Sequence, residues 1–196
     1  MLRVVRLVRL ATWLCALPLA VAHAGEADDA KLAERIARLR AQGALEREFV
    51  ETKQLALLAA PLESRGVMAF TPPDRLRWEI REPEPSLLEV AGDVVRLSKP
   101  GAKTRRLDLA SEPGARGLVD AVRLLLAGEL AALRRDYELE LSENGAHWRL
   151  SLTPRAAPLR RIVARLELTG AQDAPRELLL EFSNGDRSRV VFEAAR

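Results

Sequence analysis

Few side chains in this 196-residue chain could do chemistry, and they stand far apart in the sequence. Beyond residue 24 the one histidine is His147, beside Trp148 at the start of a predicted strand, where an ordinary edge position is expected. Glu138 and Glu140 alternate along another predicted strand, so they share its solvated side and do not form an acid–base pair. No H-x-x-x-H, H-E-x-x-H or G-x-S-x-G motif and no glycine-rich phosphate loop occurs, and the serines have no identifiable base. The sequence therefore predicts no enzyme activity, no metal and no cofactor.

The elements that hold these side chains begin after an N-terminal targeting segment. Three arginines open this segment, at Arg3, Arg6 and Arg9. Residues 10–21 are apolar, and Ala22-His23-Ala24 is an A-x-A cleavage site of the kind that ends a secretory signal peptide. We therefore expect a signal peptide over residues 1–24, cleavage near Ala24, and one periplasmic domain over residues 25–196.

Two other interpretations of the targeting segment are weaker. An uncleaved membrane anchor would need about 20 apolar residues to cross a bilayer, and the apolar run is shorter. Acylation of Cys15 after cleavage would need a small residue before it, and Leu14 stands there. Because Cys15 is the only cysteine, the domain that follows holds neither a disulfide nor a thiolate metal site.

The charge of the domain argues against a nucleic-acid partner. The whole chain has 31 basic and 28 acidic residues, and the targeting segment carries three of the basic ones and none of the acidic ones. Subtracting three from 31 leaves 28 basic residues in the domain, equal to its 28 acidic residues. A neutral domain lacks the positive field that attracts nucleic acid or an anionic membrane surface.

Two stretches have the spacing of amphipathic helices, at residues 27–42 and 117–127. Leu130 and Leu133 are placed to extend the second helix after Gly128. The apolar stripes of the two helices are Leu32, Ile36, Leu39, Leu118, Val122 and Leu125.

The rest of the domain, from residue 45 on, has the period of two that is typical of strands. Proline, glycine and Asn-Gly turn signals divide it into strands at residues 45–60, 63–70, 74–83, 86–90, 94–98, 103–109, 135–142, 146–152, 159–168, 176–182 and 187–193. Loops are expected at residues 111–117 and 153–158. Short turns between consecutive strands predict an antiparallel sheet, not a nucleotide-binding α/β fold.

One side of this sheet is apolar. In the last five predicted strands every second residue belongs to it: Tyr137, Leu139, Leu141, Trp148, Leu150, Leu152, Ile162, Ala164, Leu166, Leu168, Leu178, Leu180, Phe182, Val190 and Phe192. The residues between them are mostly Arg, Glu and Ser, so the other side faces water. We therefore predict a β-dominated α+β fold, in which a sheet of about ten or eleven strands curls around the two helical segments.

Several stretches resemble the periplasmic lipoprotein carrier family typified by LolA. The similarity lies in "FVETK", a strand opening at Gly66, "PPDRLRWEIREP", "LLEVAGDVVRL", "LSENGAHWRLSLTPR" and "RELLLEFSNGDRSRVVFE". It runs from about Lys31 to Phe192, nearly the whole domain. The resemblance implies an open half-barrel sheet whose concave, apolar face is covered by helices and receives the acyl chains of a lipidated cargo.

The resemblance also implies site residues and partners. The expected lipid-binding cavity consists of Met68, Phe70, Leu76, Trp78, Ile80, Leu88, Val90, Leu139, Leu150, Leu166 and Leu180. The two helical stripes would form its lid. The partners would be an acylated lipoprotein or other lipid cargo, an inner-membrane exporter and an outer-membrane acceptor, with the carrier itself a monomer. The alternative is that Leu76, Trp78 and Ile80 pack a closed core, because a core and a cavity wall demand the same side chains.

One position departs from the family pattern. Carriers of this family place an arginine directly before the proline of the strand connection, where it ties the lid to the sheet, and here that position is Pro72. Arg75 and Arg77 are predicted to face water and cannot be assumed to replace it. Either the lid closes by another contact, or this is a paralogue with a different cargo or a different exporter. The alternative function is a sensor or accessory module of the same fold that assists a lipid or polyene exporter. The end of the chain at Arg196, soon after the last predicted strand, favours the free carrier.

Overall fold

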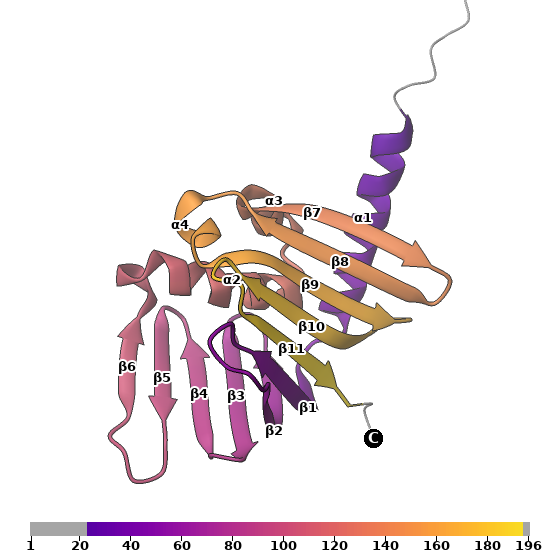
Figure 1. Cartoon of the computed structure of the whole chain (residues 1–196). Coiled ribbons are helices and arrows are strands. Elements are labelled where there is room, and N and C mark those ends of the chain that lie inside the picture. Colours follow the sequence, from indigo (N-terminus) through magenta and orange to yellow (C-terminus); the bar gives the residue numbers. More distant parts are fainter. Residues whose placement is uncertain (1–22, 194–196) are drawn as a thin grey trace, which may run out of the picture.

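A computed structural model describes residues 23–193, which fold around a single antiparallel sheet of eleven strands (Figure 1). The strands are β1 Leu45–Gln54, β2 Leu62–Thr71, β3 Arg75–Glu82, β4 Ser86–Ala91, β5 Val94–Ser98, β6 Arg105–Asp108, β7 Tyr137–Asn144, β8 His147–Pro154, β9 Val163–Ala171, β10 Ala174–Phe182 and β11 Arg187–Phe192. Their order across the sheet is β6-β5-β4-β3-β2-β1-β11-β10-β9-β8-β7. The predicted β-dominated fold is thus confirmed, while nearly all of the predicted signal peptide lies outside the described residues.

The helices are more numerous than the two segments that the sequence predicts. They are α1 His23–Ala41, η1 Leu109–Ser111 (a single 3₁₀ turn), α2 Pro113–Ala127, α3 Leu130–Asp136 and α4 Ala157–Arg160. α2 starts within the predicted loop 111–117 because proline suits the first turn of a helix. α4 likewise forms inside the predicted loop 153–158.

Gly128 explains why α3 is a separate helix and not an extension of α2. Its φ of 69° places it in the left-handed region, where glycine ends helices without strain. A Cβ at this position would also lie 2.4 Å from the Cβ of Arg40 and 3.0 Å from the carbonyl oxygen of Ile36. The glycine therefore both ends α2 and lets it approach α1 closely.

The first strand is shorter than its sequence predicts. The alternating pattern predicts a strand over residues 45–60, but β1 ends at Gln54. Its pairing with β2 runs from Leu45 opposite Phe70 to Lys53 opposite Leu62. Residues 55–61 have no strand opposite them, so they form a loop at the end of the β1–β2 hairpin.

The prediction for the inner face of β9 is wrong at the start of the strand, where a bulge changes which residue is buried. Ile162 and Ala164 are predicted to be apolar-face residues, but Ile162 is 41% exposed and Ala164 is exposed as well. Val163 between them is fully buried instead. The register of β9 and β10 shifts between Glu181 and Phe182, which turns the start of β9 by one residue.

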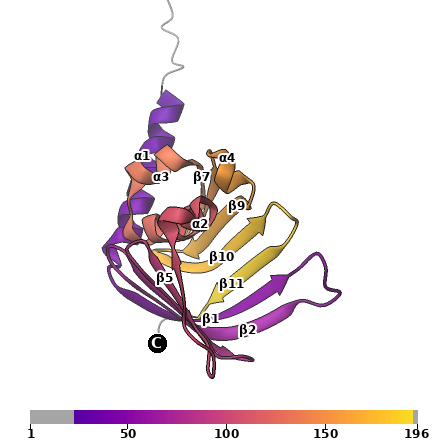
Figure 2. The same cartoon turned by 90° about the vertical axis from the view of Figure 1, so that its left-hand side faces the viewer.

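The sheet is strongly curved, and the chain crosses its concave side once in the middle of the sequence (Figure 1, Figure 2). The strands at its two edges, β6 and β7, follow one another in the sequence. The connection between them holds η1, α2 and α3, so these helices lie over the concave face. None of the helices between residues 23 and 193 is both long and apolar enough to cross a bilayer.

Candidate functional site: the concave apolar face and its helices

The predicted cavity residues all belong to the concave side of the sheet. Each of the eleven lies in the buried core or packs directly against it. They differ in exposure, however, because Phe70, Val90, Leu150 and Leu166 are almost completely buried. Those four are part of the packed core in this conformation. Leu76, Met68 and Leu180 are buried more marginally, and a last group is only half-buried, namely Trp78, Ile80, Leu88 and Leu139.

Leu139 is not brought together with the other half-buried residues. It lines a shallow surface recess with Leu32 of α1 and the charged residues Asp28 and Lys31. This recess lies between α1 and β7, whereas Trp78, Ile80 and Leu88 lie on β3 and β4 in the other half of the sheet. The predicted cavity list therefore combines two separate regions of the concave side.

The predicted apolar stripes of the two helices also contain both buried and half-buried residues. Leu32, Ile36, Leu39 and Leu125 are buried in the core, whereas Leu118 and Val122 are half-buried. Ala115 and Val119, one turn away on α2, are half-buried as well and pack against the core. α2 thus has one face sealed against the rest of the protein and a second apolar face that stays partly open.

The opposite face of α2 is held by close contacts with α4 and β7. A Cβ on Gly114 would lie 1.9 Å from the side chain of Ile162, and one on Gly117 would lie 2.8 Å from that of Leu159. The hydroxyl of Tyr137 donates a hydrogen bond of 2.6 Å to the carbonyl oxygen of Gly117. Burial raises the pKa of this hydroxyl well above its usual range.

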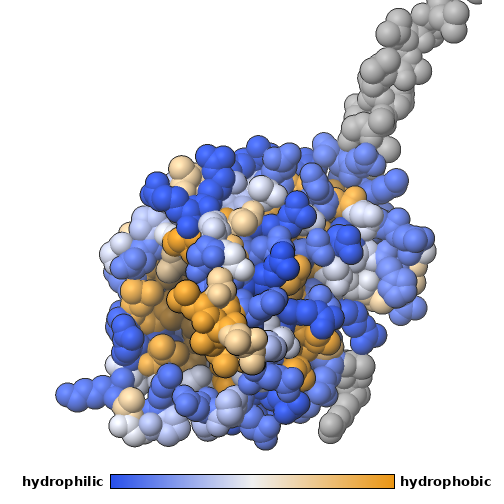
Figure 3. Space-filling model, viewed as in Figure 1, coloured by the Kyte–Doolittle hydropathy of each residue, from blue (hydrophilic) through white to orange (hydrophobic). Residues whose placement is uncertain are grey.

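Apolar atoms gather in a hollow on the face shown in Figure 3, toward its lower left. In the same view of the ribbon, α2, the strands β3–β6 and the β1–β2 loop lie there (Figure 1). We call this region the apolar hollow. The half-buried inward residues of α2, β3 and β4 include Trp78, Ile80, Leu88, Leu118 and Val122.

α2 and the sheet share a small void. Trp78 and Met68 line it with Val122 and Leu126 of α2 and with Leu178 and Phe192. Its volume is about 20 Å³, which is room for about one water molecule. Trp78 also stacks on Phe49, with ring centroids 4.3 Å apart and planes tilted by 36°. In this conformation the void is too small for an acyl chain, which could enter it only if α2 moved.

Arginines of α2 attach it to two turns of the sheet. Arg123 donates a hydrogen bond from Nη1 to the carbonyl oxygen of Gly92, at 2.9 Å. Its Nη2 lies 3.9 Å from Oδ2 of Asp74, and this same oxygen accepts a 3.0 Å hydrogen bond from the backbone N–H of Gly92. Two turns earlier, Arg116 donates from Nη2 to Asp93 at 2.9 Å. We call this set of contacts the α2 clamp.

One contact of the α2 clamp, Arg123 with Asp74, reaches the turn in which the sequence has Pro72. Pro72 is exposed and lies two residues before Asp74, in the β2–β3 turn. In this protein the arginine that contacts this turn is on the helix. The sequence shows Arg123 only as one more cation of an amphipathic helix, so its role could not be recognised there.

α1 is held by an arginine of its own. Arg35, whose side chain is 8% exposed, donates two hydrogen bonds to Oε1 of Glu143 at 2.9 and 2.6 Å. It also donates to the carbonyl oxygen of Gln172 at 2.6 Å, and its guanidinium lies 4.9 Å from the ring centroid of Trp148. α1 is thereby attached to the ends of the β7–β8 and β9–β10 hairpins, away from the apolar hollow.

A polar group interrupts the concave face on β1. Glu51, only 5% exposed, accepts hydrogen bonds from Ser188 at 2.6 Å and from Ser64 at 3.3 Å, and Lys53 lies 3.3 Å away. The alternation of β1 places it two residues after the inward Phe49, so the period of the strand is a signal that could have identified it. Among residues 23–193 no group of three or more acids or histidines is placed to hold a metal ion.

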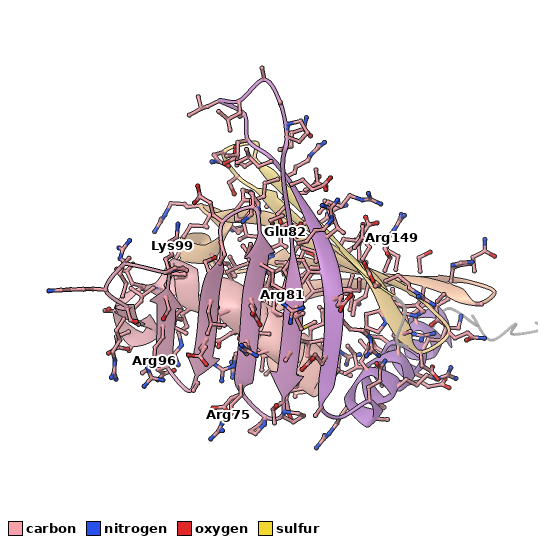
Figure 4. All side chains as sticks on the ribbon, turned by 90° about the horizontal axis from the view of Figure 1, so that it is seen from below. Arg75, Arg81, Glu82, Arg96, Lys99 and Arg149 are labelled. Atoms are coloured by element: carbon pink, nitrogen blue, oxygen red, sulfur yellow. The ribbon has the colours of Figure 1, made fainter. Side chains whose placement is uncertain are left out.

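The convex face of the sheet carries the charges that the sequence predicts for it. Figure 4 views the sheet from this side, with α2 behind the strands. Arg75, Arg81 and Arg96 are labelled there and are exposed, as is Arg77. The prediction that these arginines of β3 face water is confirmed.

Comparisons with solved structures find similar folds at low sequence identity. A LolA superfamily protein from Nitrosomonas europaea is 13% identical, with a TM-score of 0.47, over 84% of this chain and 91% of that one. A putative outer membrane lipoprotein-sorting protein domain from Vibrio parahaemolyticus is 10% identical, with a TM-score of 0.46, over 85% and 90%. MucB is 19% identical, with a TM-score of 0.45, over 86% of this chain and 58% of that one.

A comparison with curated proteins finds no significant match. A family profile, in contrast, covers the whole of the described domain. The profile is described as "Outer membrane lipoprotein carrier protein LolA-like" and matches residues 22–196. It thus takes in all eleven strands, α1 and α2. The chain belongs to this LolA-like family.

Proposed function

We propose that this protein is a periplasmic carrier that binds the acyl chains of a lipoprotein or related lipid and takes it from the inner to the outer membrane. The observation that carries the proposal is the half-buried apolar face of α2, from which Val122 lines a small void together with Trp78 of β3. If this face of α2 served only as core, its apolar side chains would be fully buried. Family membership agrees with a binding or carrier role rather than catalysis.

The physical basis of binding is the transfer of methylene groups out of water. Burial contributes about 0.8 kcal/mol for each CH₂, so even one acyl chain gains several kcal/mol when it leaves water. The hollow is lined mainly by aliphatic side chains, which adapt to a flexible chain. Because no covalent bond forms, the same contacts can be released when the cargo reaches its acceptor.

Loading in this scheme begins at the hollow and continues under α2. The void behind Trp78 is too small for an acyl chain, so the helix must move outward for deeper binding. The α2 clamp holds the closed position through hydrogen bonds at the helix surface, and these can break without unfolding the core. The proposed partners of the protein are an inner-membrane exporter and an outer-membrane acceptor, and the proposed carrier is a monomer.

Native mass spectrometry of the protein recovered from the periplasm, followed by lipid extraction, tests this function. The expected result is a monomer with a co-purifying lipoprotein or acyl lipid, and uptake of a fluorescent fatty-acyl probe by the emptied protein. Protein that is recovered empty and does not take up the probe would contradict the carrier function. A sensor of the same fold would instead co-purify with a protein partner.

A further inference from the structure

The loop at the end of the β1–β2 hairpin is the most apolar exposed part of the described chain. Its sequence from Leu55 to Pro61 is LALLAAP, without a charge or a hydrogen-bonding side chain. Leu57 is 97% exposed and Leu58 is 48% exposed, and Leu62 at the start of β2 is 49% exposed. Figure 2 and Figure 4 both show this loop extending beyond the rest of the sheet.

The loop is held in this position by its own hydrogen bonds. The backbone N–H of Leu58 donates to the carbonyl oxygen of Leu55 at 3.0 Å, which closes a turn around Leu57. The backbone N–H of Ala56 donates to Oδ1 of Asp186 in the β10–β11 turn at 2.8 Å. The leucines are therefore presented to the surroundings by a loop that these hydrogen bonds hold in place, and adjacent exposed apolar residues can mark a protein or membrane interaction site.

Besides Asp186, which accepts from Ala56, the charged residues near the loop lie where it joins the strands. Lys53 ends β1, Glu63 and Arg65 begin β2, and Arg187 begins the neighbouring β11. Their side chains are between 43% and 60% exposed. The hairpin thus has an apolar tip and a charged base, which is the order of polarity met at the surface of a bilayer from the acyl region outward.

We propose that this loop inserts into the surface of a lipid bilayer and docks the protein there directly. A bilayer suits the loop better than a protein partner, because the tip is convex and small, whereas stable protein interfaces bury at least about 1,000 Å² with matched shapes. A lipid surface needs no matching shape, and apolar loops enter its headgroup boundary by a few ångströms. The loop lies on the same side of the molecule as the apolar hollow (Figure 1, Figure 3).

Docking at this point would bring the hollow next to the membrane that supplies or receives a lipid. The inference goes beyond the proposed function, since it assigns a membrane contact to the empty protein. It does not depend on whether the hollow takes an acyl chain. The two can therefore be tested separately on the same preparations.

The test uses residues 25–196, which hold every strand and the whole core, with vesicles of phosphatidylethanolamine and a minority of phosphatidylglycerol. In flotation experiments the wild type should rise with the vesicles. The double variant Leu57→Ser/Leu58→Ser should lose this binding about tenfold or more, because two leucines no longer leave water. The control Val191→Thr changes another exposed apolar residue, on the convex side of β11, and should float like the wild type.

Fluorescence gives a second readout that does not depend on the stability of the double variant. Because the only native cysteine is Cys15, the variants Leu57→Cys and Val191→Cys each carry a single thiol for an environment-sensitive dye. Vesicles should shift the emission of the dye at residue 57 to the blue and leave that at residue 191 unchanged. High salt should not abolish the shift, since apolar insertion is not screened.

Several outcomes would overturn the proposal. Wild-type protein that stays in the aqueous fraction would contradict it, and so would a double variant that floats like the wild type. A dye response that requires native inner-membrane vesicles and disappears after their proteolysis would assign the loop to a membrane protein instead. Uptake of an acyl probe by the double variant, measured in parallel without vesicles, separates a failure of this inference from a failure of the carrier function.

Discussion

Arg123 of α2 donates a hydrogen bond to the carbonyl oxygen of Gly92, in a turn of the sheet that the helix covers. The two residues belong to elements that move apart if α2 leaves the concave face. Nε of Arg123 is buried and makes no hydrogen bond to another described residue. The contact is therefore a suitable place to change the position of α2 without changing the apolar hollow.

Arg123→Met should release α2 and speed the uptake of a fluorescent fatty-acyl probe about fivefold. The expected factor corresponds to the loss of one hydrogen bond, about 1 kcal/mol. Stopped-flow fluorescence measures the rate of uptake. The control is Arg75→Met, which changes an exposed arginine at the start of β3. Uptake at the wild-type rate would show that the α2 clamp does not limit loading.

Locking α2 in place through the other contact of the α2 clamp should have the opposite effect. Arg116 and Asp93 can both be replaced by cysteine and joined by a bismaleimide, because the domain has no cysteine of its own. We expect the joined protein to lose probe uptake and the unjoined double variant to keep it. If the joined protein loads normally, acyl chains enter without movement of α2.

Trp78→Glu should abolish acyl binding while the protein is still secreted and folded. Trp78 stacks on Phe49 and borders both the hollow and the small void, so a carboxylate there places a charge against the acyl chain. The control is Arg77→Glu, one residue away on the convex side. Probe titration gives the affinity and urea unfolding checks the fold. Normal loading of Trp78→Glu would remove Trp78 from the site.

Arg35→Leu should lower the free energy of unfolding by about 2 kcal/mol, because Glu143 loses the two hydrogen bonds from Arg35 and the Gln172 carbonyl keeps only its bond from Trp148. The control is Arg38→Leu on the same helix, whose side chain is 48% exposed. That change should cost less than about 0.5 kcal/mol. Urea unfolding measures both, and equal effects would show that the buried contacts of Arg35 add nothing to stability.

Stability should fall at alkaline pH because of Tyr137. Burial raises the pKa of its hydroxyl in the folded protein, so the unfolded chain loses this proton first, from about pH 10 upward. The contribution is complete below that pH and is lost as the pH rises further toward the folded pKa. Tyr137 is the only tyrosine, so ultraviolet absorbance reports its ionisation alone.

The variant Tyr137→Phe separates ionisation from hydrogen bonding. It should lose about 1 kcal/mol at neutral pH, because the hydrogen bond to the carbonyl of Gly117 is absent. Its stability should then decline less steeply above pH 10 than that of the wild type. Titration of the wild-type tyrosine at its ordinary pKa in the folded protein would contradict the burial argument.

Most of the strands and their inner face could be predicted because they depend on local chemistry. Asn144-Gly145 and Asn184-Gly185 form the hairpin turns that they predict, and both glycines have positive φ. The alternation of leucine with charged residues placed the inward side of β7, β8 and β10 correctly. A period of two is a property of the strand itself and needs no knowledge of its neighbours.

The misplaced positions are those where several apolar residues follow one another. In LALLAAP the pattern is compatible with a strand, and only the absence of an opposing strand makes it a loop. In the run from Ile162 to Ala164 the bulge opposite Phe182 decided which residue is buried. Neither decision is written in the local pattern, because each depends on the register of a second strand.

By itself, the sequence determined the class of fold, the LolA-like family and the apolar nature of the concave side. Only the tertiary structure decided that α2 and the sheet share a small void, that Arg123 and Arg35 hold the helices, and that Leu57 stands in solvent. The physical reason is that an arginine or a leucine has the same local pattern whether it is solvated or in contact. Its partners, Gly92 and Glu143 for the two arginines, come from 31 and 108 residues away in the chain and meet it only after folding.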